Sequence, residues 1–374
     1  MTIDNTFSMH FDPSRVLPLA GRARGLNDAL NKLPMLPALA DQLEQELVEL
    51  SIHATAAIAG NPMRLDEVRE LLALDYAQAD VPAGPTVARA RREITNLGLA
   101  YAPLPKRRVE SGVFGVSEGF MRKVHAVMVQ GTVSGGMGEY AKEVQNRVLD
   151  LITRTNAQDL YDLEQAVRAG LFHYHLFRLR PFNEGNGRVA RFFESSILAV
   201  GGFRFACMML PMYYRRHTDE YLRFFPLDDS PADNADLTSF LVFMLEGLLE
   251  SLEVLRERLT APLRRLALTE RFRLLLEARE INRRSHDLLV LLLDRETVPD
   301  AEWKTGLGAE STGLHKGGSP LPFQLKDLFL KTPYKLLYDK VSEHTARRDL
   351  NRLLELGLLA KDGTSYTFQD RCLG

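Results

Sequence analysis

Residues 180–191 read R-P-F-N-E-G-N-G-R-V-A-R, and this stretch decides how the rest of the chain is interpreted. Its Gly-Asn-Gly turn allows backbone N–H groups to approach an anion, and the helix expected to follow adds the positive end of its dipole. Arg188 and Arg191 stand three residues apart, so we expect both guanidinium groups on one helix face, within reach of the same polyphosphate. Glu184 supplies a carboxylate of the kind that Mg²⁺ prefers. The pattern predicts a phosphate-binding loop that runs into a helix.

The same stretch resembles the core motif of the Fic (filamentation induced by cAMP) family, H-x-F-x-[D/E]-G-N-G-R-x-x-R, most members of which transfer AMP from ATP to a protein hydroxyl group. Seven of the eight specified positions match: Phe182, Glu184, Gly185, Asn186, Gly187, Arg188 and Arg191. The resemblance implies that Asn186 and the glycine backbone hold the α- and β-phosphates while the two arginines neutralise the outer ones. It also implies ATP (or another nucleotide) and Mg²⁺ as cofactors, with Glu184 as the metal ligand and Phe182 as a core anchor.

The mismatch is Arg180, which stands where the family has the histidine that acts as general base. A guanidinium group has a pKa above about 12 and no acceptor atom, so it cannot take a proton from a hydroxyl group. Loss of a positioned base typically lowers the rate by about 10²–10⁴. We expect Arg180 either to join the phosphate cluster or to fill the vacated base pocket. His173 and His175 precede it, and we interpret both as packed or capping side chains of a helix bundle.

Residues Thr55–Asn61 read T-A-A-I-A-G-N, which resembles the inhibitory helix of the family, [S/T]-x-x-x-E-[G/N]. In relatives, the glutamate of that pattern pairs with the second arginine of the motif and blocks productive ATP binding. Thr55 and Gly60 keep the pattern, but Ala59 stands in the position of the glutamate. The resemblance therefore implies a regulatory segment without its carboxylate, so that Arg191 has no such partner and the brake is missing.

Helical periodicity dominates the first three-quarters of the chain, and strand-like alternation is scarce. We expect helices over Leu36–Leu50, Leu65–Leu74, Val87–Leu97, Glu118–Val129, Leu160–Leu179 and Phe240–Leu259. The predicted fold class is mainly α, and the resemblance, which covers about residues 15–255, implies a Fic-type helical bundle. Family members usually carry a β-hairpin flap before the motif, which holds the target segment. Because Leu149–Leu163 has a largely helical pattern, we expect this flap to be shortened or absent.

The C-terminal segment changes character after a Gly-rich linker, Gly306–Pro320. Two short helical stretches, Gln324–Leu330 and Tyr334–Val341, precede a longer one with Ser342 as its N-cap. A turn at 361–364 then leads to a strand-like Tyr-Thr-Phe. This order resembles a winged helix-turn-helix, a small α+β module in which Thr345–Leu356 takes the recognition position.

Four side chains of that expected recognition helix are predicted to face outward and to be able to contact bases and phosphates: His344, Arg347, Arg348 and Asn351. The charge balance supports DNA contact only weakly, because nine Lys and Arg oppose seven Asp and Glu from Leu321 to Gly374. The alternative is a module for packing or dimerisation. We expect four segments in all: a helical region with the inhibitory-type helix (1–110), the Fic core (111–260), connecting helices and linker (261–320), and the winged helix (321–374).

The composition excludes several classes of protein. The formal net charge of −2 and the 26% of charged residues indicate neither a polyanion-coating protein nor an acidic tail. The cysteines, Cys207 and Cys372, have no metal-ligand spacing and form no disulfide framework, which is typical of a reducing compartment. We expect no signal peptide and no membrane span, and therefore a cytoplasmic protein. The sequence leaves homo-oligomer formation open.

Three hypotheses follow. The first is a Fic-fold ATP-binding protein, impaired in standard AMP transfer, that acts as a regulator on DNA or a partner through its winged helix. The second is an active protein nucleotidyl- or phosphotransferase with a non-standard base or donor, since family members also transfer UMP, phosphocholine or phosphate. The third is a scaffold that binds no ligand. One argument opposes this third hypothesis: two arginines that converge on one turn repel each other unless an anion lies between them. The resemblance implies a nucleotide and a protein target as partners.

Overall fold

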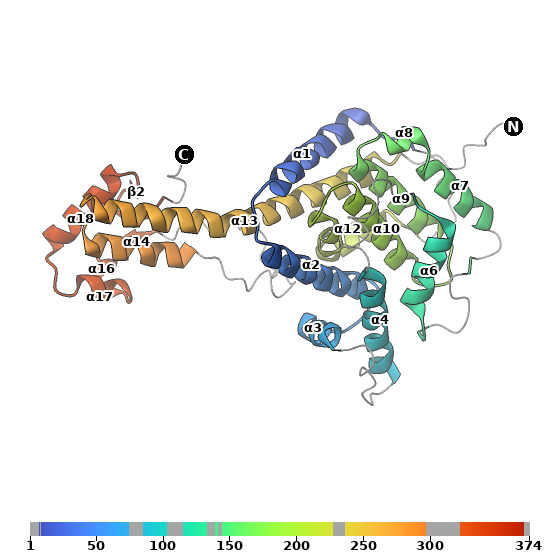
Figure 1. Cartoon of the computed structure of the whole chain (residues 1–374), viewed down its shortest axis with the longest axis horizontal. Helices are drawn as coiled ribbons and strands as arrows, with labels where there is room; N and C mark the ends of the chain where they lie inside the picture. Colours follow the sequence, from blue (N-terminus) through green and yellow to red (C-terminus); the bar gives the residue numbers. More distant parts are fainter. Residues whose placement is uncertain are drawn as a thin grey trace. The chain divides into compact units, whose positions relative to one another are not determined.

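The computed structural model of the chain describes residue 7 and residues 9–74, 85–102, 115–132, 139–140, 144–226, 236–296 and 322–369. The chain divides into two compact units, Met1–Leu255 and Arg256–Gly374, which are described separately (Figure 1). The finer division into four segments stays a prediction, and the Gly-rich segment 306–320 lies outside the described residues.

The described part of the first unit is built from helices. In chain order these are α1 (Pro13–Asn31), α2 (Pro37–Ile58), α3 (Leu65–Ala73), α4 (Pro85–Tyr101), α6 (Glu118–Val129), α7 (Gln145–Thr155), α8 (Gln158–Tyr161), α9 (Gln165–Leu179), α10 (Asn186–Val200), the 3₁₀ helix η3 (Ala206–Met208), α11 (Leu210–Arg216), α12 (Thr218–Arg223) and the first part of α13 (Thr238–Glu277), which continues into the second unit. The predicted helix at Glu118–Val129 is confirmed end to end, whereas α2 continues past the predicted Leu50 to Ile58. The described backbone from 144 to 179 consists of helices joined by turns and bends, whereas 133–138 and 141–143 lie outside the described residues. The shortened or absent flap therefore stays a prediction.

Helix α10 is the central helix of this unit. Every residue from Arg188 to Ala199 is buried, whereas a helix at the surface buries only one stripe. It packs against α9, α6 and α2 (Figure 1), and the ring centres of Phe172 in α9 and Phe193 in α10 lie 5.6 Å apart. The helix that begins at the Gly-Asn-Gly turn is therefore held on several sides, which gives the turn a rigid base.

Helix α2 changes along its length from a surface helix to a core helix. Its first turns bury Leu43 and Leu47, four residues apart, on one face. Its last turns are buried on every side from Leu50 to Ala56, a stretch that contains several small residues. This allows the helix to pass close to its neighbours and brings Thr55 into the interior of the unit.

The second unit is a small α+β module that includes the C-terminal part of α13, from Arg256 on. Its elements are α14 (Arg283–Glu296), β1 (Phe323–Gln324), α16 (Asp327–Leu330), α17 (Tyr334–Tyr338), α18 (Glu343–Glu355), β2 (Leu359–Asp362) and β3 (Ser365–Phe368). The strands form one antiparallel sheet in the order β1-β3-β2. The prediction of a helix from Gln324 is wrong at its start, because Gln324 pairs with Ser365 in the sheet and the helix begins at Asp327.

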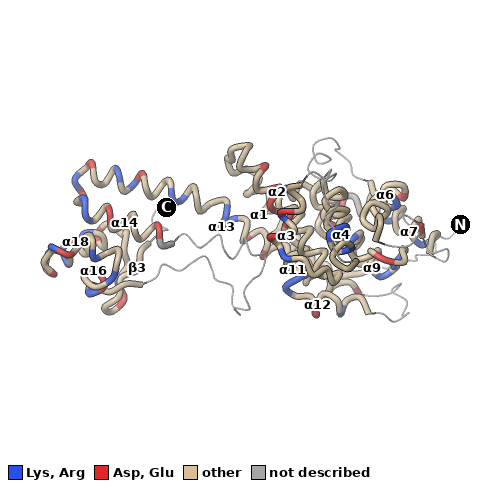
Figure 2. Tube along the Cα trace, turned by 90° about the horizontal axis from the view of Figure 1, so that it is seen from below, with Lys and Arg blue, Asp and Glu red and all other residues tan. Residues whose placement is uncertain are grey.

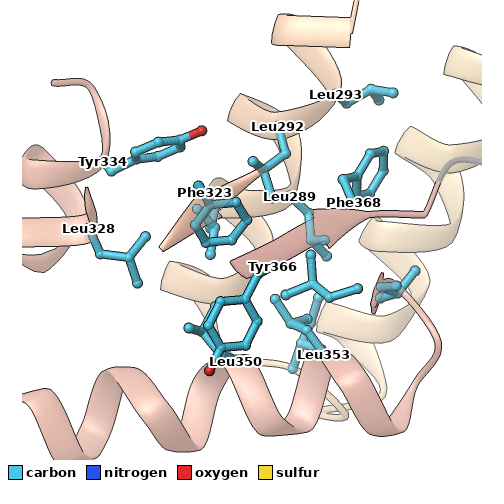
Figure 3. Packing of buried hydrophobic residues seen from close by; sticks show 14 of the residues in the cluster. Leu289, Leu292, Leu293, Phe323, Leu328, Tyr334, Leu350, Leu353, Tyr366 and Phe368 are labelled. Carbon is cyan, nitrogen blue, oxygen red and sulfur yellow. The ribbon is translucent and has the colours of Figure 1, made fainter. Parts of the chain in front are cut away.

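One apolar cluster fills the space between the sheet and its helices. It joins side chains of α14, the three strands and α18 (Figure 3): Leu289, Leu292, Phe323, Leu350, Leu353, Leu359, Tyr366 and Phe368. The predicted N-cap is confirmed, since the Ser342 side chain accepts a hydrogen bond from the Thr345 N–H. The expected fold class, mainly α with a small α+β module at the end, is confirmed. No helix in the described parts of the chain is long and apolar enough to cross a membrane.

Candidate functional site

The turn between α9 and α10 is closed by its own asparagine. The Oδ1 atom of Asn186 accepts a hydrogen bond from the Phe182 N–H at 2.9 Å, and its Nδ2 donates to the Phe182 carbonyl at 2.6 Å. Gly185 has φ +82°, a conformation that side-chain-bearing residues rarely adopt, and a Cβ there would lie 3.2 Å from Val129. The predicted loop residues are therefore brought together, and the Asn186 side chain holds the turn rather than facing outward.

His125 of α6 supports this turn from the interior. Its ring stacks on Phe182 with ring centres 3.7 Å apart, and its Nε2 donates a hydrogen bond to the Glu184 carbonyl at 3.0 Å. Burial, opposed by that hydrogen bond, lowers the pKa of His125, and the nearby Arg188 guanidinium lowers it further. A neutral imidazole thus fixes the loop. No role in the site was predicted for His125, because only the packing of α6 brings it to the loop.

Arg188, in the first turn of α10, is buried but incompletely hydrogen-bonded. Only 6% of the residue is exposed, and its Nε and Nη1 have no hydrogen-bond partner among the described residues. The Glu93 carboxylate lies 3.7 Å from Nη1, close enough for charge attraction and too far for a hydrogen bond. Burial lowers the pKa of the guanidinium. Buried donors without acceptors are rare and costly, so this arrangement suits an incoming anion.

Arg191, one turn further along α10, is fully engaged inside the protein. Its Nε donates to the Thr55 hydroxyl at 2.5 Å, its Nη2 to the Thr55 carbonyl at 3.1 Å, and its Nη1 to the Tyr221 hydroxyl at 3.2 Å. Ala59 is the C-cap of α2 and offers no carboxylate, and Gly60 follows with φ +88°. Helix α2 nevertheless holds Arg191 through Thr55, a contact that the sequence did not predict.

The Tyr221 hydroxyl leads into a buried polar chain. It bonds Nε2 of His173 at 2.9 Å, and Nδ1 of His173 bonds the Glu194 carboxylate at 2.8 Å. The Tyr214 hydroxyl donates to the same carboxylate at 2.7 Å. Since a carboxylate accepts, Nδ1–H of His173 donates to Glu194. His173 is fully buried, as its interpretation as a packed side chain requires, and His175 packs edge-on against the Phe7 ring.

Arg180 lies at the end of α9 in the left-handed conformation, with φ 46° and ψ 59°. Its Nη2 lies 3.3 Å from the carbonyl oxygens of both Phe225 and Pro226, just after α12. Arg178 donates to the same Pro226 carbonyl at 2.8 Å. In this structure Arg180 therefore donates to backbone carbonyl oxygens, and its guanidinium has no acceptor atom for a proton. Its place in the phosphate cluster or in the base pocket stays a prediction.

Glu184 is the carboxylate of the turn, and half of its side chain is exposed. Its Oε2 lies 3.2 Å from Nη2 of Arg89 in α4. No group of three potential ligands for a metal ion occurs in the described residues. Mg²⁺ is commonly bound by one or two carboxylates together with phosphate oxygens. Glu184 therefore fits a metal that arrives with a phosphate ligand, and it does not fit a cage made by the protein alone.

The candidate DNA-binding residues lie in the second unit, on α18. His344, Arg347, Arg348 and Asn351 are all exposed. Arg347 is paired with Glu343 one turn earlier on the same helix. Among the predicted candidates, the structure therefore groups the loop residues with Thr55 in the first unit, and the four α18 residues form a separate outward set.

Comparison with known proteins finds a match to one family model within the first unit. Residues 115–198 match the family model for the Fic/DOC family. A protein adenylyltransferase Fic of Culex quinquefasciatus is 25% identical over 237 residues, which cover 59% of this chain and 44% of that protein. The protein adenylyltransferase fic-1 of Caenorhabditis elegans is 25% identical over 193 residues, or 48% of this chain and 37% of that protein. The chain thus spans less than half the length of these curated relatives.

Solved structures support the fold. The Fic-1 structure from Caenorhabditis elegans has a TM-score of 0.52 at 19% identity and covers 64% of this chain and 71% of that one. A Fic family protein from Desulfovibrio desulfuricans has a TM-score of 0.51 at 18% identity, over 95% of this chain and 96% of that one. Identities this low carry information on the fold alone.

Proposed function

Because residues 115–198 match the family model for the Fic/DOC family, we propose that this chain binds ATP or another nucleotide, with Mg²⁺, at the turn between α9 and α10. We further propose that it is impaired in standard AMP transfer and acts as a regulator. The observation that carries the proposal is Arg188, a buried guanidinium with two nitrogen donors that find no acceptor among the described residues. Phosphate oxygens would satisfy both donors and the charge.

The start of α10 supports the same ligand. Gly185 is the N-cap of the helix and makes no side-chain capping hydrogen bond. The first backbone N–H groups of a helix have no partner within the helix and attract anions. The uncapped N-terminus and the Arg188 guanidinium lie within the same turn of helix. Glu184 at the exposed edge would hold Mg²⁺, which reduces the negative charge of the phosphates.

The described residues around the turn offer no base, which supports impaired transfer. Taking a proton from a target hydroxyl needs an acceptor, and Arg180 has none. Of the imidazoles that the structure shows around the turn, His125 donates its Nε2–H to Glu184 and His173 lies fully buried in the chain from Tyr221 to Glu194. Neither is oriented to take up a proton from an external hydroxyl group.

An active transferase is the alternative, and the names of the matched relatives, protein adenylyltransferases, favour it. Activity would then need a base outside this set, a substrate-assisted proton transfer, or another donor that carries UMP, phosphocholine or phosphate. A protein target belongs to both versions of the proposal.

The test is transfer of label from α-³²P-ATP with Mg²⁺, onto the chain itself and onto a cell lysate, by the natural chain and by Arg180→His. We expect no label from the natural chain and label from Arg180→His, which restores an imidazole at the vacant position. Label from the natural chain would favour the active transferase. A calorimetric titration with MgATP runs in parallel; no binding, or binding that survives Arg188→Ala, would contradict the nucleotide site.

For the second unit we propose a winged helix that contacts DNA. The three-stranded sheet, the helix pair α17 and α18 and the exposed face of α18 support this interpretation. The unit carries 21 Lys and Arg against 17 Asp and Glu from Arg256 to Gly374, and Figure 2 shows both signs of charge on its helices. Fluorescence anisotropy with duplex DNA at two salt concentrations tests it. We expect salt-dependent binding that Arg348→Ala weakens; concentration-dependent dimers without DNA binding would favour a dimerisation module.

A further inference from the structure

Helix α4 places two opposite charges against the two charged side chains of the candidate nucleotide site. Arg89 reaches Glu184 at 3.2 Å, and the Nε of Arg89 lies 3.6 Å from Glu93. Glu93 in turn lies 3.7 Å from Arg188. The result is an alternating row of charges, Glu184, Arg89, Glu93 and Arg188, which joins α4 to both ends of the loop.

The two charged residues of α4, Arg89 and Glu93, each lie beside a group that a magnesium nucleotide would bind. Arg89 takes the place of the metal ion, and Glu93 takes the place of a phosphate. Arg89 is a cation against Glu184, the carboxylate that fits a metal ion. Glu93 is an anion against Arg188, the guanidinium that fits a phosphate. Because Glu93 lies beyond hydrogen-bond distance, it neutralises Arg188 without satisfying Nε or Nη1. A phosphate would satisfy those donors and would repel Glu93 at the same time.

We propose that Arg89 and Glu93 form an electrostatic clasp, which imitates the charges of a magnesium nucleotide and must open before the nucleotide can bind. The inference rests on the proposed nucleotide site and adds its regulation. The clasp differs from the segment at Thr55–Gly60: it comes from another helix, and it acts on Arg188 rather than on Arg191.

The construction of α4 allows the clasp to open without unfolding. Its C-terminal half is buried from Ile94 to Gly98, and Asn96 donates to the carbonyl oxygens of Met128 and Gln130 at 3.3 Å and 2.8 Å. Its N-terminal turns are largely exposed, and half of the Arg89 side chain is in solvent. Glu93 also accepts a hydrogen bond from Asn61 at 3.0 Å, which offers it a neutral partner once Arg188 binds an anion.

Arg89 distinguishes the clasp from a general effect of charge. If Arg89 only adds positive potential near the loop, Arg89→Gln weakens binding of an anionic nucleotide. If Arg89 competes with Mg²⁺ for Glu184, the same change strengthens binding of the magnesium complex. The two accounts predict opposite signs for one substitution.

The experiment is a calorimetric titration of the full chain with ADP, with Mg²⁺ and again with EDTA, for the natural chain, Arg89→Gln, Glu93→Gln and Arg188→Ala. We expect Arg89→Gln to tighten MgADP binding about three- to fivefold, the size of an exposed ion pair. Glu93→Gln tightens it at least as much, because its pair with Arg188 is largely buried. The gain of Arg89→Gln disappears in EDTA, because no metal then competes for Glu184. Arg154→Gln, which breaks the 2.7 Å pair with Asp159 on the same unit, is the matched control and leaves binding unchanged.

The outcomes separate the clasp from the nucleotide site. If the natural chain binds MgADP and Arg188→Ala abolishes binding, but Arg89→Gln is unchanged or weaker, the clasp is overturned and the site stands. If no variant binds, both are overturned. Binding by both Arg89→Gln and Glu93→Gln, in variants with unchanged melting temperatures and without binding by the natural chain, supports both, because the clasp then keeps the natural site closed.

Discussion

The two sides of α10 treat two arginines of one motif in opposite ways. On the side of α2 and α12, Arg191 places three nitrogen atoms on acceptors of Thr55 and Tyr221. On the side of α4, Arg188 has two nitrogen atoms without an acceptor in the described structure and a carboxylate only at 3.7 Å. Both residues are almost fully buried. Burial alone therefore does not distinguish the two arginines; the completeness of their hydrogen bonds does, and it supports Arg188 as the arginine that we propose to bind the nucleotide.

Removing Arg191 gives the largest expected effect on stability. Arg191→Ala leaves the Thr55 and Tyr221 oxygens without donors in the core and opens a cavity between α10 and α2. We expect the free energy of unfolding to fall by about 3–4 kcal/mol. Thermal and denaturant unfolding of the full chain measure this loss. A loss below about 1 kcal/mol would mean that the hydrogen bonds of Arg191 add little, and the comparison between the two sides would break.

Removing Arg188 has the opposite profile. Arg188→Ala removes charge-assisted hydrogen bonds to the nucleotide, so we expect the affinity for MgATP to fall about 100-fold, or about 3 kcal/mol. The stability of the free protein changes by about 1 kcal/mol or less, because the lost guanidinium made few hydrogen bonds. Calorimetric titration and melting temperature are measured on one preparation. If Arg188→Ala lost much stability but kept its affinity for MgATP, Arg188 would stabilise the fold, and the contrast with Arg191 would be wrong.

The sequence predicts local features of this molecule well and distant contacts poorly. The helix at Glu118–Val129 and the N-cap at Ser342 follow from residues within one or two turns, and the structure has both. The turn before α10 follows from its glycines in the same way. The contact between Arg191 and Thr55 joins positions 136 residues apart. A motif identifies the arginine, but only the packing of helices decides which side chain it meets.

The clasp shows the same limit. Arg89 lies 95 residues before Glu184 and belongs to a helix whose apolar spacing was its sole predicted feature. Nothing local marks Arg89 or Glu93 among many exposed charges on helices. His125 is hidden for a related reason, since a lone histidine on a helix gives no sign of the carbonyl that it will bind. A site built from several helices cannot be predicted from the sequence of any one of them.

A smaller change tests the Thr55 contact by itself. Thr55→Val keeps the volume and the backbone carbonyl but removes the hydroxyl that accepts from Nε of Arg191. We expect a loss of about 1.5 kcal/mol in the free energy of unfolding, because one buried donor is left unsatisfied. Thermal unfolding measures it, with Thr260→Val as control, since the Thr260 hydroxyl bonds only an exposed carbonyl of its own helix. If both variants lost the same amount of stability, the hydrogen bond between Thr55 and Arg191 would contribute no more than an exposed one.

The smallest expected effect is the pH dependence of the free energy of unfolding. It tests the contact between α2 and Arg215, in which a histidine of α2 accepts a hydrogen bond from the arginine. Two residues before Thr55, Nδ1 of His53 accepts a hydrogen bond from Arg215 at 2.8 Å. Burial first, and then repulsion from Arg215, lower the pKa of His53 to about 4; Arg69 adds to the repulsion and Asp66 opposes it. The unfolded chain, in which this pKa is about 6.5, therefore binds more protons between these two values.

It follows that stability is complete above about pH 6.5 and falls as the pH drops towards 4, by about 1 kcal/mol between pH 7 and pH 5 after allowance for solvent screening. Protonation places a second cation against Arg215 and loosens the helix that holds Arg191. Unfolding by denaturant at several pH values measures the slope. His53→Gln, which cannot titrate, flattens it, whereas His344→Gln in the other unit controls for the loss of any histidine. An unchanged slope in His53→Gln would assign the acid sensitivity elsewhere, and the docking of α2 on Arg191 would then be independent of its neighbour.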